Sequence, residues 1–249
     1  YLKIYLSLKK IKTDYVLFCD QDDFINFKCL KKKENFLIKN KIFSAAKGLV
    51  YNFEENKNRF LLMDRCYPRE IKNNKAPFTR LKNNFHFRSY YCLHRTKNLK
   101  KFYNLIVTNK VNDVRSAEFI VDIGTLLTGQ VHLINECSLL RCADNKYNEH
   151  PISLESRVNW FFKRIINNNK ILMDILNLNK TIKISLFSIK SMILVRDIIP
   201  NFFRQKINRL NYINSRVFIK LGLKNVDNIE KKYFRSNELK KMFNLINKK

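Results

Sequence analysis

The spacing of apolar residues predicts strands alternating with amphipathic helices over the first 150 residues. Residues 1–12 place apolar side chains at helical spacing with lysines between them, so we expect an amphipathic helix there. Basic or polar helices are predicted over residues 27–40 and 95–107 in the same way. Apolar runs over residues 41–53 and 60–66 predict strands, so this part of the chain is expected to be α/β.

The most informative stretch is the apolar run at residues 15–19, which ends in Asp20, Asp22 and Asp23. An uninterrupted apolar run is typical of a central strand that is buried on both faces. Ligands of open α/β sheets bind at the carboxyl ends of such strands. Because adjacent carboxylates repel one another, the cluster indicates a bound cation, and Mg²⁺ or Mn²⁺ carrying a phosphate suits oxygen ligands. The alternative is that Asp22 or Asp23 caps the next helix, and the local sequence leaves both interpretations open.

Residues 116–128 predict a later helix, with Ser116 as its N-cap and Gly129 as its C-cap. Short strands are expected at residues 131–134 and 138–141, and residues 68–84 read as a polar loop. Gly48, inside the predicted strand 41–53, indicates a bulge or a close approach of neighbouring backbone.

From about residue 151 the chain reads as successive basic amphipathic helices. We therefore expect a mixed-sheet α/β domain over residues 1–150 and an α-helical extension over residues 151–249. The tail would lie on an anionic membrane leaflet or form an ordinary helical subdomain with solvated basic faces.

The chain is strongly basic, with 49 Lys and Arg residues against 21 Asp and Glu residues and a net charge of +28. This charge predicts an anionic partner, although abundant Lys, Asn, Ile and Phe and only 4 glycines also indicate a general compositional bias. The six cysteines form no CxxC pair, so we expect buried free thiols rather than a zinc site, and a reducing cytosol. No apolar run reaches the roughly 18 residues of a membrane span, and no signal peptide is evident.

The segment TDYVLFCDQDDF at residues 13–24 resembles the metal-binding strand end of family-2 glycosyltransferases with the GT-A fold. Further segments resemble one bacterial subgroup of these enzymes: SAAKG at 44–48, YCLHRT at 91–96, SAE at 116–118, LTGQ at 127–130 and LLR at 139–141. The resemblance covers about residues 1–145, and its specific parts are the DxDD motif and the His-Arg-Thr sequence.

The resemblance implies transfer of a sugar from a nucleotide-sugar donor to the hydroxyl of a glycan or lipid-linked acceptor, in bacterial surface glycan synthesis. Asp20 would lie near the donor's ribose or the metal, Asp22 would be the main metal ligand, and Asp23 would share the metal or bind the sugar. Glu118 matches the family's general base. Asp122, one helical turn later on the same face, is the substitute.

The resemblance also bears on residues between these acids. Arg95 would neutralise a donor phosphate, with a surface ion pair as the alternative. His94 would face the pocket or be a structural histidine, and Arg141 is a further phosphate candidate. The family's first strand and base-binding loop have no counterpart after Tyr1, so we expect a chain that lacks half of the donor site and binds donor poorly or not at all.

Two other classes stay open from the sequence. A nucleic-acid-binding protein would use the basic helices, but no helix-turn-helix, zinc or RRM signature is present. A non-catalytic scaffold would keep the fold without the activity. If the enzyme interpretation holds, we expect a cytoplasmic protein, at the inner face of the cell membrane where lipid-linked acceptors lie.

Overall fold

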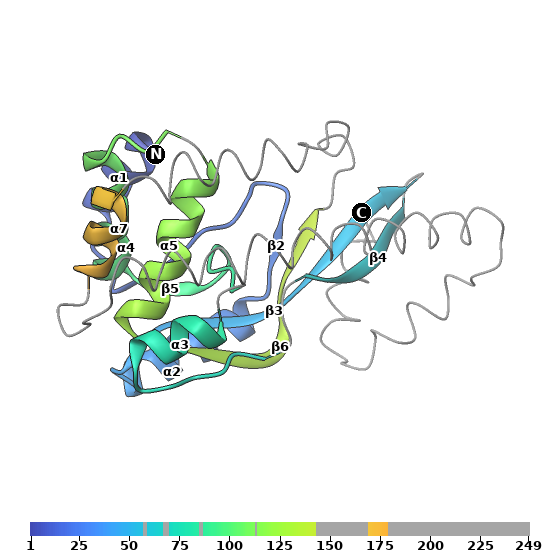
Figure 1. The fold of residues 1–249 in the computed structure, drawn as a ribbon. Coiled ribbons are helices and arrows are strands. Elements are labelled where there is room, and N and C mark those ends of the chain that lie inside the picture. The colour runs from blue at the N-terminus through green and yellow to red at the C-terminus, as the bar shows by residue number, and fades with distance from the viewer. Residues whose placement is uncertain (57–58, 67–69, 85–86, 113, 143–168, 179–249) are drawn as a thin grey trace, which may run out of the picture.

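The computed structural model describes residues 1–56, 59–66, 70–84, 87–112, 114–142 and 169–178. These residues form a mixed α/β fold in which helices pack on a strongly curled sheet (Figure 1). In chain order the elements are α1 (Leu2–Lys10), β1 (Tyr15–Leu17), β2 (Phe24–Ile25), α2 (Phe27–Lys39), β3 (Phe43–Asn56), β4 (Arg59–Cys66), α3 (Pro77–Asn83), β5 (Leu93–Arg95), α4 (Thr96–Thr108), α5 (Val114–Thr128), β6 (Gln130–Cys142) and α7 (Asn169–Leu176).

The long strand β3 is the centre of the sheet, whose strand order is β1-β5-β3-β6-β2. It runs parallel to β6, with Phe43 opposite Gln130 and Phe53 opposite Cys142, and antiparallel to β5. The far end of β3 also pairs with β4, which lies off the main path of the sheet. Figure 1 shows this β3–β4 hairpin projecting away from the helices.

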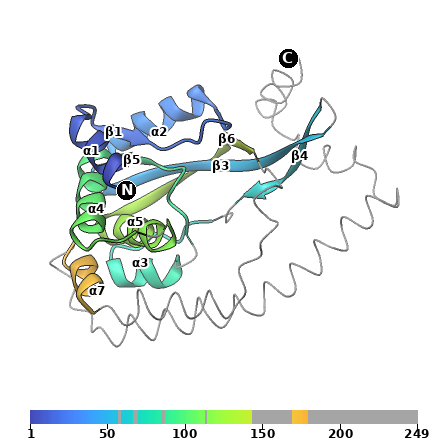
Figure 2. The ribbon, with the colours of Figure 1, turned by 90° about the horizontal axis from the view of Figure 1, so that it is seen from above.

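The two faces of β3 pack against different helices. Ala45 belongs to the large apolar cluster that includes Phe102 of α4 and Ile120 of α5. Ala46, its neighbour, packs with Leu37 of α2 on the opposite face. This is the alternation expected of a strand, and it leaves α2 on one side of the sheet and α3, α4 and α5 on the other (Figure 2).

The prediction of a central strand at residues 15–19 is wrong in position. β1 ends at Leu17, and among the described strands it pairs with β5 alone, at one end of the sheet. Tyr15 and Leu17 contact the cluster beneath α2, whereas Val16 and Phe18 contact the cluster of α4 and α5. The run is apolar because both faces of β1 are covered, which does not require a strand on both edges.

Of the other predicted helices, strands and loops, some are confirmed and some are wrong. Helices α1, α2 and α4 and strands β3 and β4 confirm the expected elements. The predicted loop at residues 68–84 contains α3, and the two short strands predicted after residue 130 are one strand, β6. Helix α5 begins at Val114, so Ser116 lies inside the helix and is not its cap. Gly129 serves a close approach, since a Cβ there would lie 2.7 Å from the backbone nitrogen of Ser44.

The predicted helical extension is described only at α7. Its side chains Ile171, Ile175 and Leu176 join the same apolar cluster as α4 and α5. Residues 151–168 and 179–249 lie outside the described residues, so the division at residue 150 stays a prediction. None of the described helices is both long and apolar enough to cross a membrane.

Gly48 is required where β3 passes between β6 and α2. A Cβ at this position would lie 2.4 Å from the Cβ of Ser138 and 3.1 Å from Sγ of Cys29. The register with β6 also shifts directly after Gly48, so the glycine marks both a close approach and an irregularity in the ladder.

We expect Gly48→Ala to lower the free energy of unfolding by about 1–3 kcal/mol, because the added methyl overpacks this contact. Urea unfolding followed by circular dichroism measures the change. Ser138→Gly removes the opposing Cβ, so in a double-mutant cycle it should offset part of the loss. A Gly48→Ala variant as stable as the wild type would show that the neighbouring strands move apart at no cost.

Candidate active site

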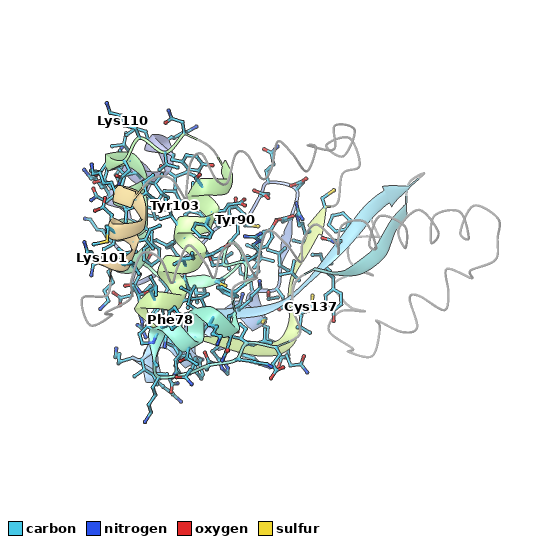
Figure 3. The ribbon with its side chains drawn as sticks, in the orientation of Figure 1. Phe78, Tyr90, Lys101, Tyr103, Lys110 and Cys137 are labelled. Carbon is cyan, nitrogen blue, oxygen red and sulfur yellow. The ribbon has the colours of Figure 1, made fainter. Side chains whose placement is uncertain are left out.

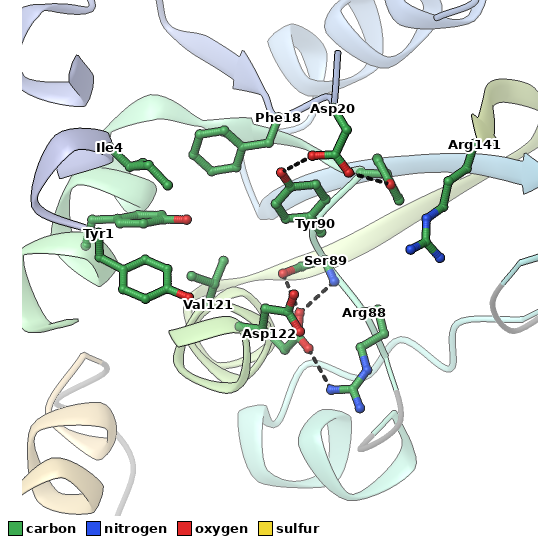
Figure 4. Close-up of a pocket in the computed structure, with 13 residues that line it drawn as sticks. Tyr1, Ile4, Phe18, Asp20, Arg88, Ser89, Tyr90, Val121, Asp122 and Arg141 are labelled. Atoms are coloured by element: carbon green, nitrogen blue, oxygen red, sulfur yellow. Dashed lines mark hydrogen bonds and ion pairs between the residues drawn. The ribbon is translucent and has the colours of Figure 1, made fainter. Parts of the chain in front are cut away.

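A pocket of about 330 Å³ opens where α1, the loop after β1 and α5 meet (Figure 4). Its wall combines aromatic rings, acids and two arginines: Tyr1, Ile4, Phe18, Asp20, Arg88, Ser89, Tyr90, Tyr91, Tyr103, Glu118, Val121, Asp122 and Arg141. The acids predicted from the sequence at positions 20, 118 and 122 therefore lie in one cavity. Arg141, the further phosphate candidate, joins them from the end of β6.

Asp122 anchors the pocket from inside α5, where its side chain is buried. Its Oδ1 accepts hydrogen bonds from the backbone nitrogen of Ser89 at 2.7 Å and from Ser89 Oγ at 2.6 Å. Nη1 of Arg88 lies 3.1 Å from the other oxygen, Oδ2. Burial raises the pKa of Asp122, and the contacts with Arg88 and Ser89 act in the opposite direction.

His94 holds the same segment from the sheet side. Its Nε2 lies 2.8 Å from the backbone oxygen of Ser89, so this nitrogen carries the proton and donates it. Burial lowers the pKa of His94 to about 4, and the imidazole is neutral at physiological pH. Of the two interpretations from the sequence, the structural one is confirmed.

The tyrosines that follow Ser89 carry the contact to Asp20. The Tyr90 hydroxyl donates to Oδ1 of Asp20 at 2.9 Å, and the Tyr91 hydroxyl donates to Oδ2 at 3.2 Å. Burial, with a further contribution from the hydrogen bond to Asp20, raises the pKa of Tyr90, which stays a phenol donor. Both oxygens of this carboxylate are thus oriented by protein groups.

Aromatic rings form the remaining wall. The ring of Phe18 stacks on Tyr90 with centroids 5.9 Å apart and meets Tyr103 edge-on at 5.7 Å. Tyr1 lies 6.4 Å from Tyr103, centroid to centroid. Figure 3 shows Tyr90 and Tyr103 beside α5. This wall offers a flat apolar surface next to carboxylates.

Glu118 differs from Asp122 in its surroundings. It lies one helical turn earlier on α5 and lines the pocket, but its side chain is exposed. Since Glu118 is exposed at the pocket whereas Asp122 is buried, Glu118 is the acid of α5 that is better placed to exchange a proton with a ligand. The sequence placed Glu118 in the first turn, but the helix begins four residues before it.

Asp22 and Asp23 do not line the pocket. Asp23 accepts backbone N–H groups, from Asp20 at 3.4 Å on Oδ2 and from Cys142 at 3.2 Å on Oδ1. Asp22 is exposed. The alternative that one of them caps α2 is wrong, because Oδ1 of Asn26 accepts the first free N–H groups of that helix.

The described carboxylates of this loop are engaged by protein donors. The oxygens of Asp20 accept from the phenols of Tyr90 and Tyr91, and those of Asp23 accept from two backbone amides and share the Tyr91 hydroxyl with Asp20. Among the described residues, no group of three or more His, Cys, Asp or Glu side chains is arranged to hold a metal. The expected role of Mg²⁺ or Mn²⁺ at Asp20, Asp22 and Asp23 stays a prediction that this arrangement does not support.

Arg95, expected to bind phosphate, points elsewhere. Its guanidinium donates to the backbone oxygens of Phe43 at 2.8 Å, Leu37 at 2.7 Å and Asn40 at 3.0 Å. It therefore closes the C-terminal end of α2 against β3, and it is neither a pocket residue nor part of a surface ion pair. The phosphate role of Arg95 stays a prediction, which these contacts do not support.

The segment at residues 88–91 was not assigned a role from the sequence. The feature of the sequence that could have identified this segment is an arginine and a serine within the largely aromatic run FHFRSYY at residues 85–91. Polar residues in such a run indicate buried hydrogen-bond partners, but only the fold shows that these are Asp122 and Asp20.

Comparisons with known proteins do not assign this chain to a family. Neither the models of known protein families nor the sequences of curated proteins give a significant match to this chain. The site is therefore interpreted from its own geometry and chemistry.

We expect stability to fall as the pH drops from 6.5 to 5, because the unfolded chain protonates His94 and the folded chain does not until pH is about 4. The loss over this range is about 1.5 kcal/mol for His94 alone. Urea midpoints measured at steps of pH check it.

The variant His94→Gln keeps an N–H donor for Ser89 and does not titrate. Its stability should therefore depend less on pH over the same range. His132, whose pKa is also lowered by burial, contributes equally to both proteins. Parallel pH profiles for the two proteins would contradict a neutral buried His94.

Proposed function

We propose that this chain is a glycosyltransferase that transfers a sugar from a nucleotide-sugar donor to an acceptor hydroxyl, and that the pocket described above is its active site. The observation that carries this proposal is the convergence of Asp20, Glu118 and Asp122. These residues match the acidic positions of the family-2 enzymes. Asp20 is about a hundred residues from the two acids of α5, yet all three line one cavity. The finer GT-A assignment of the mixed sheet belongs to the same proposal.

The lining suits a sugar. Carboxylates accept hydrogen bonds from hydroxyl groups, and aromatic faces such as Tyr90 and Phe18 pack against the apolar face of a sugar ring. The volume of about 330 Å³ is at the lower end of small-molecule sites, which agrees with one sugar ring and part of its phosphate.

The roles of the acids follow from their contacts. The acceptor oxygen forms a bond to the anomeric carbon, the bond from that carbon to the phosphate oxygen breaks, and the acceptor proton passes to Glu118. Asp122 is a positioning residue, because it holds Arg88 and Ser89 in place. The guanidinium groups of Arg88 and Arg141 lie at the same cavity and offset negative charge on the departing nucleotide.

Mg²⁺ or Mn²⁺, implied by the resemblance, takes no step in this mechanism, because no group of three or more His, Cys, Asp or Glu side chains among the described residues is arranged to hold a metal. Glycan or lipid-linked acceptors, a surface polysaccharide as product and a location at the inner membrane face stay predictions of the resemblance.

We expect Glu118→Gln to lower kcat by about 100- to 10,000-fold, the usual contribution of a general base. The measurement is nucleotide release by the full chain from a panel of nucleotide sugars, with and without EDTA. Glu136→Gln is the matched control, because Glu136, on β6, pairs with Lys32 of α2 and does not line the pocket.

Equal activity of the Glu118→Gln and Glu136→Gln variants would exclude Glu118 as the base. Failure of every donor to give nucleotide release at concentrations well above about 1 mM, where weak donor binding no longer limits the rate, would contradict the proposed function itself. Circular dichroism verifies that the protein is folded. Activity that EDTA leaves unchanged would show that the acids and arginines act without a divalent ion.

A further inference from the structure

The outer side of α2 exposes large apolar side chains that no described element covers. Phe27 is 75% exposed, Ile42 just past the helix end is 66% exposed, and Ile38 is 48% exposed. The first two are the most exposed large hydrophobic side chains among the described residues. Several exposed apolar side chains on one element indicate a contact surface.

Two of these side chains lie along one stripe of α2. Phe27 and Ile38 are eleven positions apart, which is three helical turns, so they point to the same side of the helix. Lys31, Glu34 and Asn35 lie between them on that side; Lys31 and Asn35 are exposed and Glu34 is half-buried. We define the α2 face as this stripe with its flanking lysines: Phe27, Lys28, Lys31, Lys32, Asn35, Ile38, Lys39, Lys41 and Ile42.

The α2 face is positively charged. It contains five lysines, and two glutamates pair with it: Glu34 lies 2.7 Å from Lys31, and Glu136 pairs with Lys32. Positive charge therefore remains after both pairs are counted. Lysines near an anionic lipid surface each add to binding, while apolar side chains enter the boundary between headgroups and acyl chains.

The fold presents this face outward. The opposite side of α2 buries Cys29, Lys33 and Leu37 against the sheet. Figure 2 shows α2 on the opposite side of the sheet from α3, α4 and α5. Contact with the outer side of α2 would therefore leave the buried side chains of this helix in place.

We propose that the α2 face docks on an anionic lipid membrane, with Phe27, Ile38 and Ile42 entering the interface and the lysines facing lipid phosphates. Nucleic acid would attract the same lysines, but it offers no apolar layer for a row of Phe and Ile side chains. The proposal does not depend on the pocket or on glycosyl transfer.

The test is sedimentation of the full chain with vesicles of phosphatidylcholine alone, and of phosphatidylcholine with 30% phosphatidylglycerol, at 150 mM salt. We expect binding to the anionic vesicles only. The variant Phe27→Ser/Ile38→Ser/Ile42→Ser should bind at least about tenfold more weakly. Lys28→Gln/Lys39→Gln/Lys41→Gln should bind about a hundredfold more weakly, at about fivefold for each lysine.

Matched controls change the same residue types on α1 and directly after it. Lys9→Gln/Lys10→Gln/Lys12→Gln removes equal charge, and Leu2→Ser/Leu6→Ser removes two exposed apolar side chains. Both controls should bind like the wild type. Circular dichroism verifies that every variant is folded, which all the altered positions allow because they are exposed.

Equal losses in the α1 and α2 variants would overturn the proposal in favour of diffuse charge attraction. Unchanged vesicle binding by the α2 variants, or no binding to anionic vesicles, would also overturn it. Binding to duplex DNA that is as tight as vesicle binding and insensitive to the three apolar substitutions would assign the surface to nucleic acid instead.

Discussion

The buried carboxylate of Asp122 is the contact on which the arrangement of the pocket depends. It accepts the backbone and side-chain donors of Ser89 and faces the guanidinium of Arg88, so it fixes the path of the segment in front of α5. The two tyrosines that follow Ser89 then reach Asp20 in the loop after β1. A carboxyl group can be buried at this position because each of its oxygens has a hydrogen-bond donor. Loss of either Asp122 or the segment Arg88–Ser89 would therefore leave the other with unpaired polar groups.

Much of the fold was predictable, because helical and strand periodicities report which faces of an element are covered. The same signal misplaced β1. Val16 packs toward α4 and α5 while Tyr15 and Leu17 pack toward α2, so the strand is apolar on both faces although it lies at an edge. An apolar run indicates that both faces of a strand are packed against other elements. It does not indicate whether both edges of the strand are hydrogen-bonded to neighbouring strands.

The candidate site was predictable in part. The acids at positions 20, 118 and 122 were identified because carboxylates after a strand and on a helix face have recognisable settings. Arg95 and Arg88 were not distinguished, since both are arginines close to aromatic residues and their difference is entirely tertiary. Arg95 binds the carbonyl groups at the end of α2, whereas Arg88 binds Asp122. Spacing along the chain cannot separate these outcomes.

The parallel pairing of β3 with β6 has a consequence for how the chain folds. Phe43 and Gln130 meet although they are about 90 residues apart, so the central ladder closes a long loop and gives the domain a high contact order. Helices α2, α4 and α5 form from local contacts. The sheet that joins them forms only after Gln130–Cys142 pairs with β3. The pocket takes side chains from before Phe43, such as Asp20, and from after Gln130, such as Arg141, so its wall is complete only once this ladder has closed.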